Sequence, residues 1–140
     1  TLFPYTTLFR SDSYVAAHRI DPDRIYIEGM SMGGTGVWNM ILAYPYYFAA
    51  AIPMCGMVPA QWYDVPGAFE AIKNTPVWAY HCKDDPEMPE AETAKAVQAL
   101  KDAGRVLGFY QFQQRKEGPD GIREFTAQRG IRPGGGQVLQ

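Results

Sequence analysis

The sequence is poor in several residue types that mark common classes of protein. Its 140 residues include two cysteines and two histidines, and basic and acidic residues nearly balance, for a formal net charge of −2. Two cysteines far apart in the chain form no disulfide framework and do not identify a redox compartment. The near-neutral charge gives no electrostatic basis for binding nucleic acid or an anionic membrane, so neither is expected as a partner.

Long apolar runs are also missing, since no run approaches the roughly 20 residues that a membrane-spanning helix needs. Residues 1–11 lack the continuous apolar segment and the small-residue cleavage site of a signal peptide, so the sequence does not indicate a compartment. Core-forming residues are abundant, with 46% hydrophobic and 14% aromatic. That composition predicts one globular domain with a substantial core. The oligomeric state is not indicated.

The two ends of the chain differ in composition from its middle. Thr-Leu-Phe occurs at 1–3 and again at 7–9 without a helix or strand period. The run 1–11 resembles a translated sequencing adapter and is interpreted as a non-native leader. From residue 113 onward glycines and charges outnumber apolar residues, which predicts that 113–140 are disordered or translated out of frame. The folded part is therefore expected to be 12–112.

Strands and helices are predicted to alternate within this middle part. Apolar runs predict strands at 25–27, 50–54 and 77–81, with a further one at 106–112, and periodic segments predict helices at 12–19, 32–44 and 90–103. Strands that are apolar throughout and alternate with helices are typical of a parallel sheet covered on both faces. The predicted fold class is therefore α/β.

The most informative stretch is the predicted turn between the first strand and the helix after it, Gly29-x-Ser31-x-Gly33. This pattern is typical of a nucleophile elbow, where a strained strand-to-helix turn projects a serine hydroxyl from the top of the sheet. Side chains at either glycine would collide as strand and helix close. The amide of Met32 would point to the space where an oxyanion forms. We therefore predict Ser31 as a nucleophile and Met32 as an oxyanion-hole donor.

Other glycine motifs fit this stretch poorly. A phosphate-binding P-loop needs a lysine before its Ser or Thr, and Gly33-Gly34-Thr35 has none. A dinucleotide-binding fingerprint needs a glycine where Ser31 stands. No nucleotide, metal or other cofactor is therefore expected. The alternative interpretation is a glycine-rich turn that only connects strand and helix.

Residues 57–74 are predicted to form an irregular loop rich in aromatic side chains, including Trp62, Tyr63 and Phe69. These side chains could line a substrate pocket or cap the core, and the sequence leaves both interpretations open. His18 precedes the first strand, so it is expected on the side opposite the elbow.

Three blocks of the sequence, residues 21–34, 48–56 and 76–81, together resemble the α/β-hydrolase superfamily. The resemblance is closest to its prolyl-oligopeptidase-like and carboxylesterase branch, including predicted peptidases and feruloyl- or acetyl-xylan-esterase-like proteins, and covers about 12–104. It implies a partial α/β-hydrolase fold with a Ser-His-Asp triad. The implied substrates are small carboxylic esters or other acylated molecules, with peptides as a further possibility.

The resemblance also implies a catalytic acid. The family pattern His-Gly-x-x-Asp-x-x-Val-Pro matches residues 81–89, with cysteine replacing the glycine and methionine replacing the valine. In this register Asp85 is the acid, Asp84 is its solvated neighbour, and His81 is not the base. Loops after parallel strands leave the same sheet edge, so we expect Asp85 and Ser31 to converge there. The alternative is that both aspartates belong to an exposed turn.

The family's chain order is Ser, Asp, His, but no histidine follows His81. No loop before residue 12 matches the family's second oxyanion donor. The chain is therefore interpreted as an internal fragment of a serine hydrolase, lacking the catalytic histidine and expected to be inactive by itself. The alternatives are a non-catalytic hydrolase-fold module that binds through the aromatic loop, and an inactive gene remnant.

Overall fold

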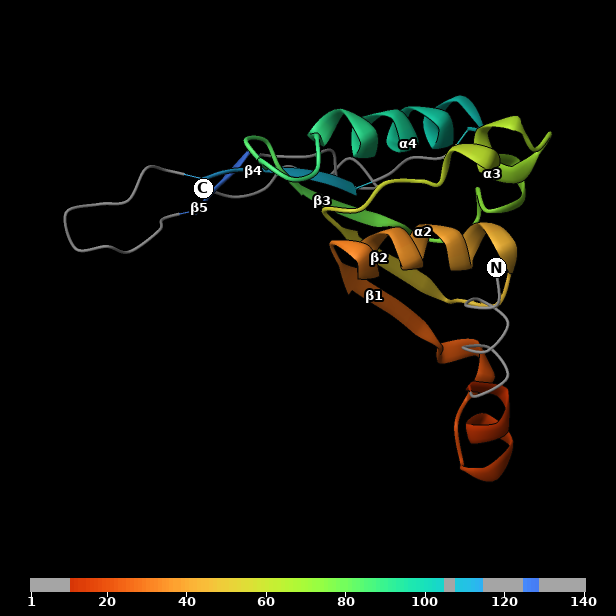
Figure 1. Cartoon of the computed structure of the whole chain (residues 1–140). Helices are drawn as coiled ribbons and strands as arrows, with labels where there is room; N and C mark the ends of the chain where they lie inside the picture. Colours follow the sequence, from red (N-terminus) through yellow and green to blue (C-terminus); the bar gives the residue numbers. More distant parts are fainter. Residues whose placement is uncertain (1–10, 105–107, 115–124, 129–140) are drawn as a thin grey trace, which may run out of the picture.

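The computed structural model describes residues 11–104, 108–114 and 125–128, which form a single five-stranded sheet with helices packed on it (Figure 1). The strands are β1 (Tyr26–Met30), β2 (Ala50–Met54), β3 (Trp78–Cys82), β4 (Gly108–Gln114) and β5 (Phe125–Gln128), and they lie side by side in chain order. β1 to β4 are parallel, and β5 is antiparallel to β4. The predicted α/β class is confirmed, and the three strands predicted as clearest are parallel.

The helical elements are η1 (Pro22–Arg24), α2 (Met32–Ala43), η2 (Ala60–Asp64), α3 (Ala68–Ala71) and α4 (Glu90–Asp102), and residues 11–17 are also helical. The predicted helices correspond to residues 11–17, α2 and α4, and three short helical elements that were not predicted, η1, η2 and α3, occur between them. Acidic residues in the first turn of α4 and Gly104 just after its end, at φ +84°, suit the helix dipole and a left-handed helix end. None of the described helices is long and apolar enough to cross a membrane.

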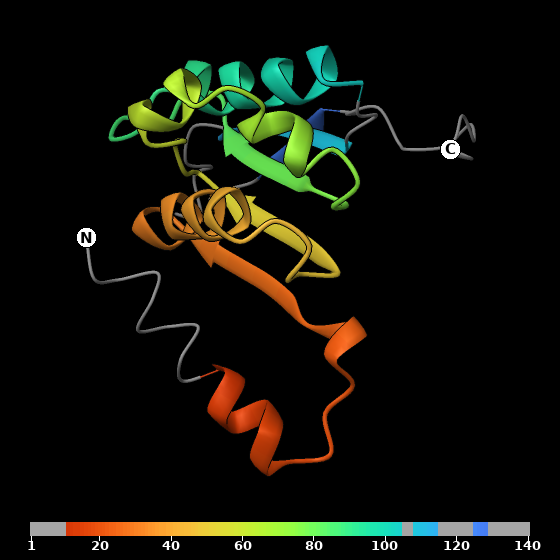
Figure 2. The same ribbon diagram turned by 90° about the vertical axis from the view of Figure 1, so that its right-hand side faces the viewer.

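The core lies between the sheet and the helices α2, α3 and α4. Figures 1 and 2 show these helices on the same face of the sheet. Its buried members come from all three helices and from β2 and β3, among them Trp38, Ile41, Ile72, Ala79 and Leu100. Side chains along a strand alternate between faces, so one face of each strand is buried here.

The opposite face of the sheet carries Tyr26, Met30 and Trp78, which are 67%, 70% and 40% exposed. In the described part of the chain the packed helices thus cover one face, whereas the sequence predicted helices on both. The prediction rested on apolar runs, and the exposed side chains are themselves apolar, so their hydropathy could not distinguish a covered face from an open one.

Two further segments differ from the sequence-based expectations. The loop at 57–74 contains the short helices η2 and α3 rather than being wholly irregular. The end of β4 and all of β5 fall in the segment 113–140, for which no regular structure was expected. Most of the expected leader and tail, residues 1–10, 115–124 and 129–140, lies outside the described residues, so the domain boundaries remain predictions.

Candidate active site

Ser31 forms the whole turn between β1 and α2. It follows Met30, the last residue of β1, and α2 begins at the next residue, so one residue must reverse the chain. Its φ of 56° and ψ of −120° lie in a region that costs a non-glycine residue about 1–3 kcal/mol. The Ser31 N–H donates to Met54 O over 2.9 Å, which attaches the turn to β2. The sharp turn predicted at Ser31 is confirmed.

Of the two glycines predicted to be required around Ser31, only Gly29 has the predicted role. A Cβ on Gly29 would lie 2.5 Å from Gly33 O, so the approach of strand and helix does require a glycine at Gly29. A Cβ on Gly33 would meet nothing within 4 Å, so the prediction that its side chain would collide is wrong. The backbone of Gly33 is the group that approaches β1, and its Cβ direction points away from the strand.

Met32 is the first residue of α2 and its side chain is exposed. The first N–H groups of a helix have no partner within the helix and carry the positive end of its dipole. The amide of Met32 is one of these groups and directly follows Ser31. Its position suits an oxyanion donor, and that role remains a prediction.

Asp85 lies in the loop after β3 and its carboxylate organises that loop. Its Oδ1 accepts hydrogen bonds from Met88 N over 3.0 Å and from Glu87 N over 2.9 Å. The Met88 amide is the main cause that lowers the pKa of Asp85 below its ordinary value, with smaller contributions from the Glu87 amide and the Cys55 thiol. Asp84, in contrast, is exposed and accepts a bond from the Cys82 thiol.

The sheet topology brings the Ser31 and Asp85 loops to one edge. β1 and β3 are both parallel to β2, so their carboxyl ends lie at the same edge of the sheet. Cys55, the first residue after β2, stands between the two loops, and its N–H donates to Tyr80 O over 2.8 Å. This arrangement suits the expected convergence of Ser31 and Asp85, whose catalytic roles remain predictions.

Sequence reasoning missed a cluster next to Asp85. The side chains of Cys55, His81 and Asp85 offer one sulfur, one ring nitrogen and one carboxylate oxygen that lie within 4.8 Å of one another. Burial is the main cause that raises the pKa of the Cys55 thiol, and the Asp85 carboxylate, to which the thiol donates, raises it further. The only signal in the sequence was that Cys55 directly follows an apolar strand.

His81 is fully buried on the helix-covered face of β3 and is fixed at both ring nitrogens. Nδ1 lies 2.7 Å from Thr93 Oγ1, and Nε2 lies 2.9 Å from Met88 O. The Thr93 hydroxyl in turn donates to Gly56 O over 2.8 Å. These contacts tie the end of β3 to α4 and to the chain after β2, which suits the prediction that His81 is not the catalytic base.

Replacing Thr93 with valine should destabilise the fold by about 1–3 kcal/mol, because Gly56 O and the His81 ring would each lose a buried partner. Thr93→Ser keeps the hydroxyl and serves as the matched control, with a smaller loss. Urea unfolding of both variants measures the difference. Equal stability of the two would show that the hydroxyl contributes little.

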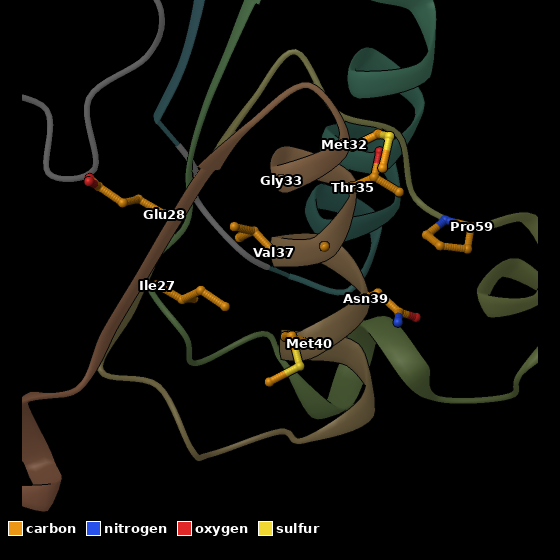
Figure 3. A pocket seen from close by; sticks show the side chains of 10 residues that line it. Ile27, Glu28, Met32, Gly33, Thr35, Val37, Asn39, Met40 and Pro59 are labelled. Atoms are coloured by element: carbon orange, nitrogen blue, oxygen red, sulfur yellow. The ribbon is translucent and has the colours of Figure 1, made fainter. Parts of the chain in front are cut away.

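A cavity of about 600 Å³ lies beside the elbow, against β1 and α2. Figure 3 shows Ile27 from β1 and Val37 and Met40 from α2 pointing toward the same space, with Pro59 on the far side of α2. The complete lining is Ile27, Glu28, Met32, Gly33, Thr35, Gly36, Val37, Asn39, Met40 and Pro59. The cavity is thus mainly apolar and begins at the residues that directly follow Ser31.

The aromatic side chains of the 57–74 segment are not among the residues lining this cavity. Trp62, Tyr63 and Phe69 pack against the core cluster, and Trp62 Nε1 donates to Asn39 Oδ1 over 2.7 Å. Lys95 Nζ lies 3.9 Å above the Tyr63 ring. Of the two interpretations left open by the sequence, the structure supports capping of the core.

Known proteins are similar to this chain in sequence and fold. A family model described as phospholipase/carboxylesterase matches residues 10–118. Among solved structures, a thermostable esterase is 32% identical and superposes with a TM-score of 0.72 over 81% of this chain. An acylaminoacyl peptidase of Pyrococcus horikoshii shares the fold, with 19% identity and a TM-score of 0.65 over 77% of this chain.

A shorter match links the chain to a curated enzyme. The poly(3-hydroxyalkanoate) depolymerase C of Paucimonas lemoignei is 42% identical over 45 residues, which are 32% of this chain. The chain spans only part of each of these relatives: 11% of the depolymerase, 29% of the esterase and 22% of the peptidase. The resemblance to carboxylesterases of the α/β-hydrolase superfamily is confirmed, and the peptidase has a similar fold.

Proposed function

Because this chain belongs to the phospholipase/carboxylesterase family of α/β-hydrolases, we propose that it carries the nucleophile and the acid of a serine ester hydrolase. The observation that carries the proposal is the backbone of Ser31, which is strained as a nucleophile elbow requires. Ser31 attacks the carbonyl carbon of an ester, and the Met32 amide stabilises the resulting oxyanion. Asp85 orients the histidine that removes the serine proton.

The apolar cavity beside the elbow supports ester substrates whose acyl or alcohol part is apolar. Its lining side chains, such as Ile27, Val37 and Met40, offer dispersion contacts and no charge, apart from Glu28 at one side. In Figure 3, the Glu28 carboxylate points away from the other labelled side chains. Small neutral esters are therefore proposed over charged peptides as substrates.

The base is the element that this sequence does not supply. The chain contains two histidines, His18 and His81. His18 precedes β1, at the end of that strand opposite Ser31, and its Nδ1 contacts Tyr14 O. His81 is buried and contacts Thr93 and Met88. We therefore propose that the histidine of the triad comes from outside this sequence.

The nucleophile is tested by covalent labelling with a fluorophosphonate, which phosphonylates activated serines. The chain has three serines, Ser11, Ser13 and Ser31, so the first two are internal controls. With imidazole added as an external base in place of the missing histidine, mass spectrometry of the labelled peptides should find an adduct at Ser31 alone, and Ser31→Ala should remove it. Equal labelling of all three serines, or none at Ser31, would contradict the elbow assignment and favour a non-catalytic binding module.

Turnover by this chain alone is expected to be near background. Loss of a general base costs about 10²–10⁴-fold, and loss of one oxyanion donor costs about 10²–10³-fold. Hydrolysis of 4-nitrophenyl acetate should therefore be similar for this chain and for Ser31→Ala. Multiple turnovers that Ser31→Ala abolishes would show that a base is present, and His81→Ala would then test whether it is His81.

A further inference from the structure

Three side chains of the types that bind zinc converge beneath the Asp85 loop. Cys55 directly follows β2, His81 is in β3, and Asp85 follows β3, and their ligand atoms lie within 4.8 Å of one another. Thiolate, imidazole and carboxylate are the common protein ligands of Zn²⁺. Asp85 Oδ2 lies 3.8 Å from His81 Nε2. Two such ligand atoms on one tetrahedral zinc, each about 2.0–2.2 Å from the metal, lie about 3.4 Å apart. A small shift of the Asp85 side chain toward His81 would therefore allow both to bind one zinc ion.

The hydrogen bonds of His81 leave Nε2 as the ring nitrogen that faces the cluster. A hydroxyl has one proton, and Thr93 donates its proton to Gly56 O. Toward His81 Nδ1 the Thr93 oxygen is therefore an acceptor, and Nδ1 carries a hydrogen. Nε2 also faces acceptors, with Met88 O at 2.9 Å and the Asp85 carboxylate beyond it. Nε2 is thus the ring nitrogen that lies next to the other two ligand side chains.

The surroundings hold each ligand in a fixed orientation, as metal sites require. Metal-bound histidines normally make an outer hydrogen bond through the ring nitrogen that does not bind the metal. His81 makes such a bond from Nδ1 to Thr93 Oγ1, and the Thr93 hydroxyl donates in turn to Gly56 O. Asp85 uses Oδ1 to accept the Glu87 and Met88 amides, which leaves Oδ2 directed at His81. Cys55 is held at φ +47° by the backbone, a conformation that is unusual for a non-glycine residue.

We propose that Cys55, His81 and Asp85 bind Zn²⁺ through Sγ, Nε2 and Oδ2. On binding, the S–H bond of Cys55 breaks, its proton passes to solvent, and a Zn–S bond forms. A proton on Nε2 leaves in the same way. Met88 O or a water molecule supplies the fourth ligand. If the proposed function also holds, zinc withdraws Asp85 from the triad and inhibits the enzyme.

The site is tested by titrating the purified chain with Co²⁺, which occupies zinc sites and reports on thiolate ligands by absorption. One equivalent of Co²⁺ should produce a thiolate-to-cobalt charge-transfer band, and one equivalent of Zn²⁺ should remove it. Cys55→Ala should abolish the band, whereas Cys82→Ala, which removes the other cysteine, should keep it. No band in the unmodified chain, or a band that survives Cys55→Ala, would overturn the proposal.

Two aspartate variants provide a matched pair for the carboxylate ligand. Asp85→Asn should weaken Co²⁺ binding at least tenfold, whereas Asp84→Asn should leave it unchanged, because Asp84 contacts Cys82 outside the cluster. Circular dichroism verifies that each variant is folded. Equal weakening by both substitutions would contradict Asp85 as a ligand.

The zinc site and the esterase proposal fail independently. Ser31→Ala should bind Co²⁺ as the unmodified chain does, because Ser31 is not in the cluster. Labelling of Ser31 without metal binding would overturn the zinc site only. Metal binding without labelling of Ser31 would overturn the proposed function only.

Discussion

Replacing Gly34 with alanine is expected to destabilise the protein by about 3 kcal/mol, at the upper end of the range for overpacked sites. A Cβ on Gly34 would lie 2.3 Å from Met54 O, far inside contact distance. Met54 O is the group that accepts the Ser31 N–H, so the collision also displaces the bond that holds the elbow on β2. Urea unfolding measures the loss.

Gly36 provides the matched control for this substitution, since it lies in the same helix two residues further on. A Cβ there would meet nothing within 4 Å. Alanine in a helix interior is favoured over glycine by about 0.5–1 kcal/mol, so Gly36→Ala should stabilise the protein. Similar losses at both positions would mean that close packing of α2 on β2 is not the cause.

Replacing Trp38 with alanine should destabilise the protein by about 3–5 kcal/mol, which is the usual cost of truncating a buried aromatic residue to alanine. Trp38 is fully buried and is the largest side chain in the core. It lies on the face of α2 that packs against the sheet, so its loss leaves a cavity that the fixed strands cannot close. Calorimetry and urea unfolding would both detect the effect.

Two tryptophan variants sharpen this experiment. Trp78 is 40% exposed on the open face of the sheet, so Trp78→Ala should cost about 1 kcal/mol or less. Trp38→Phe should cost much less than Trp38→Ala, because the Trp38 Nε1 donor has no hydrogen-bond partner among the described residues. An equal loss for Trp38→Ala and Trp78→Ala would contradict the assignment of the core to one face.

The sequence predicted the elements whose signal is local. Local patterns predicted β1, the turn at Ser31 and α2. The spacing of apolar residues and of glycines that indicates these elements occurs within about fifteen consecutive residues. The position of Asp85 was indicated by its register in a family motif. Both kinds of signal lie in consecutive residues, and neither needs knowledge of packing.

What the sequence did not reveal depends on contacts between distant residues. Thr93 contacts Gly56, 37 residues earlier in the chain, and Cys55 meets Asp85 only because β2 and β3 are neighbours. The need for glycine at Gly34 rather than Gly33 depends on which residue faces β2. No periodic pattern encodes these juxtapositions, so neither the cluster nor its zinc-binding chemistry was predictable.

The strand order also has a consequence for how the protein folds. Neighbours in the sheet are neighbours in sequence, so each described strand adds beside the one before it. Each pair of parallel strands is joined by one crossover segment, which forms a loop when the two strands pair. The entropic cost of closing such a loop rises only slowly with its length. None of the described strands has to insert between two that have already paired. Such a sheet can grow in the direction of synthesis, and we expect its refolding to lack the slow phase that late strand insertion would impose.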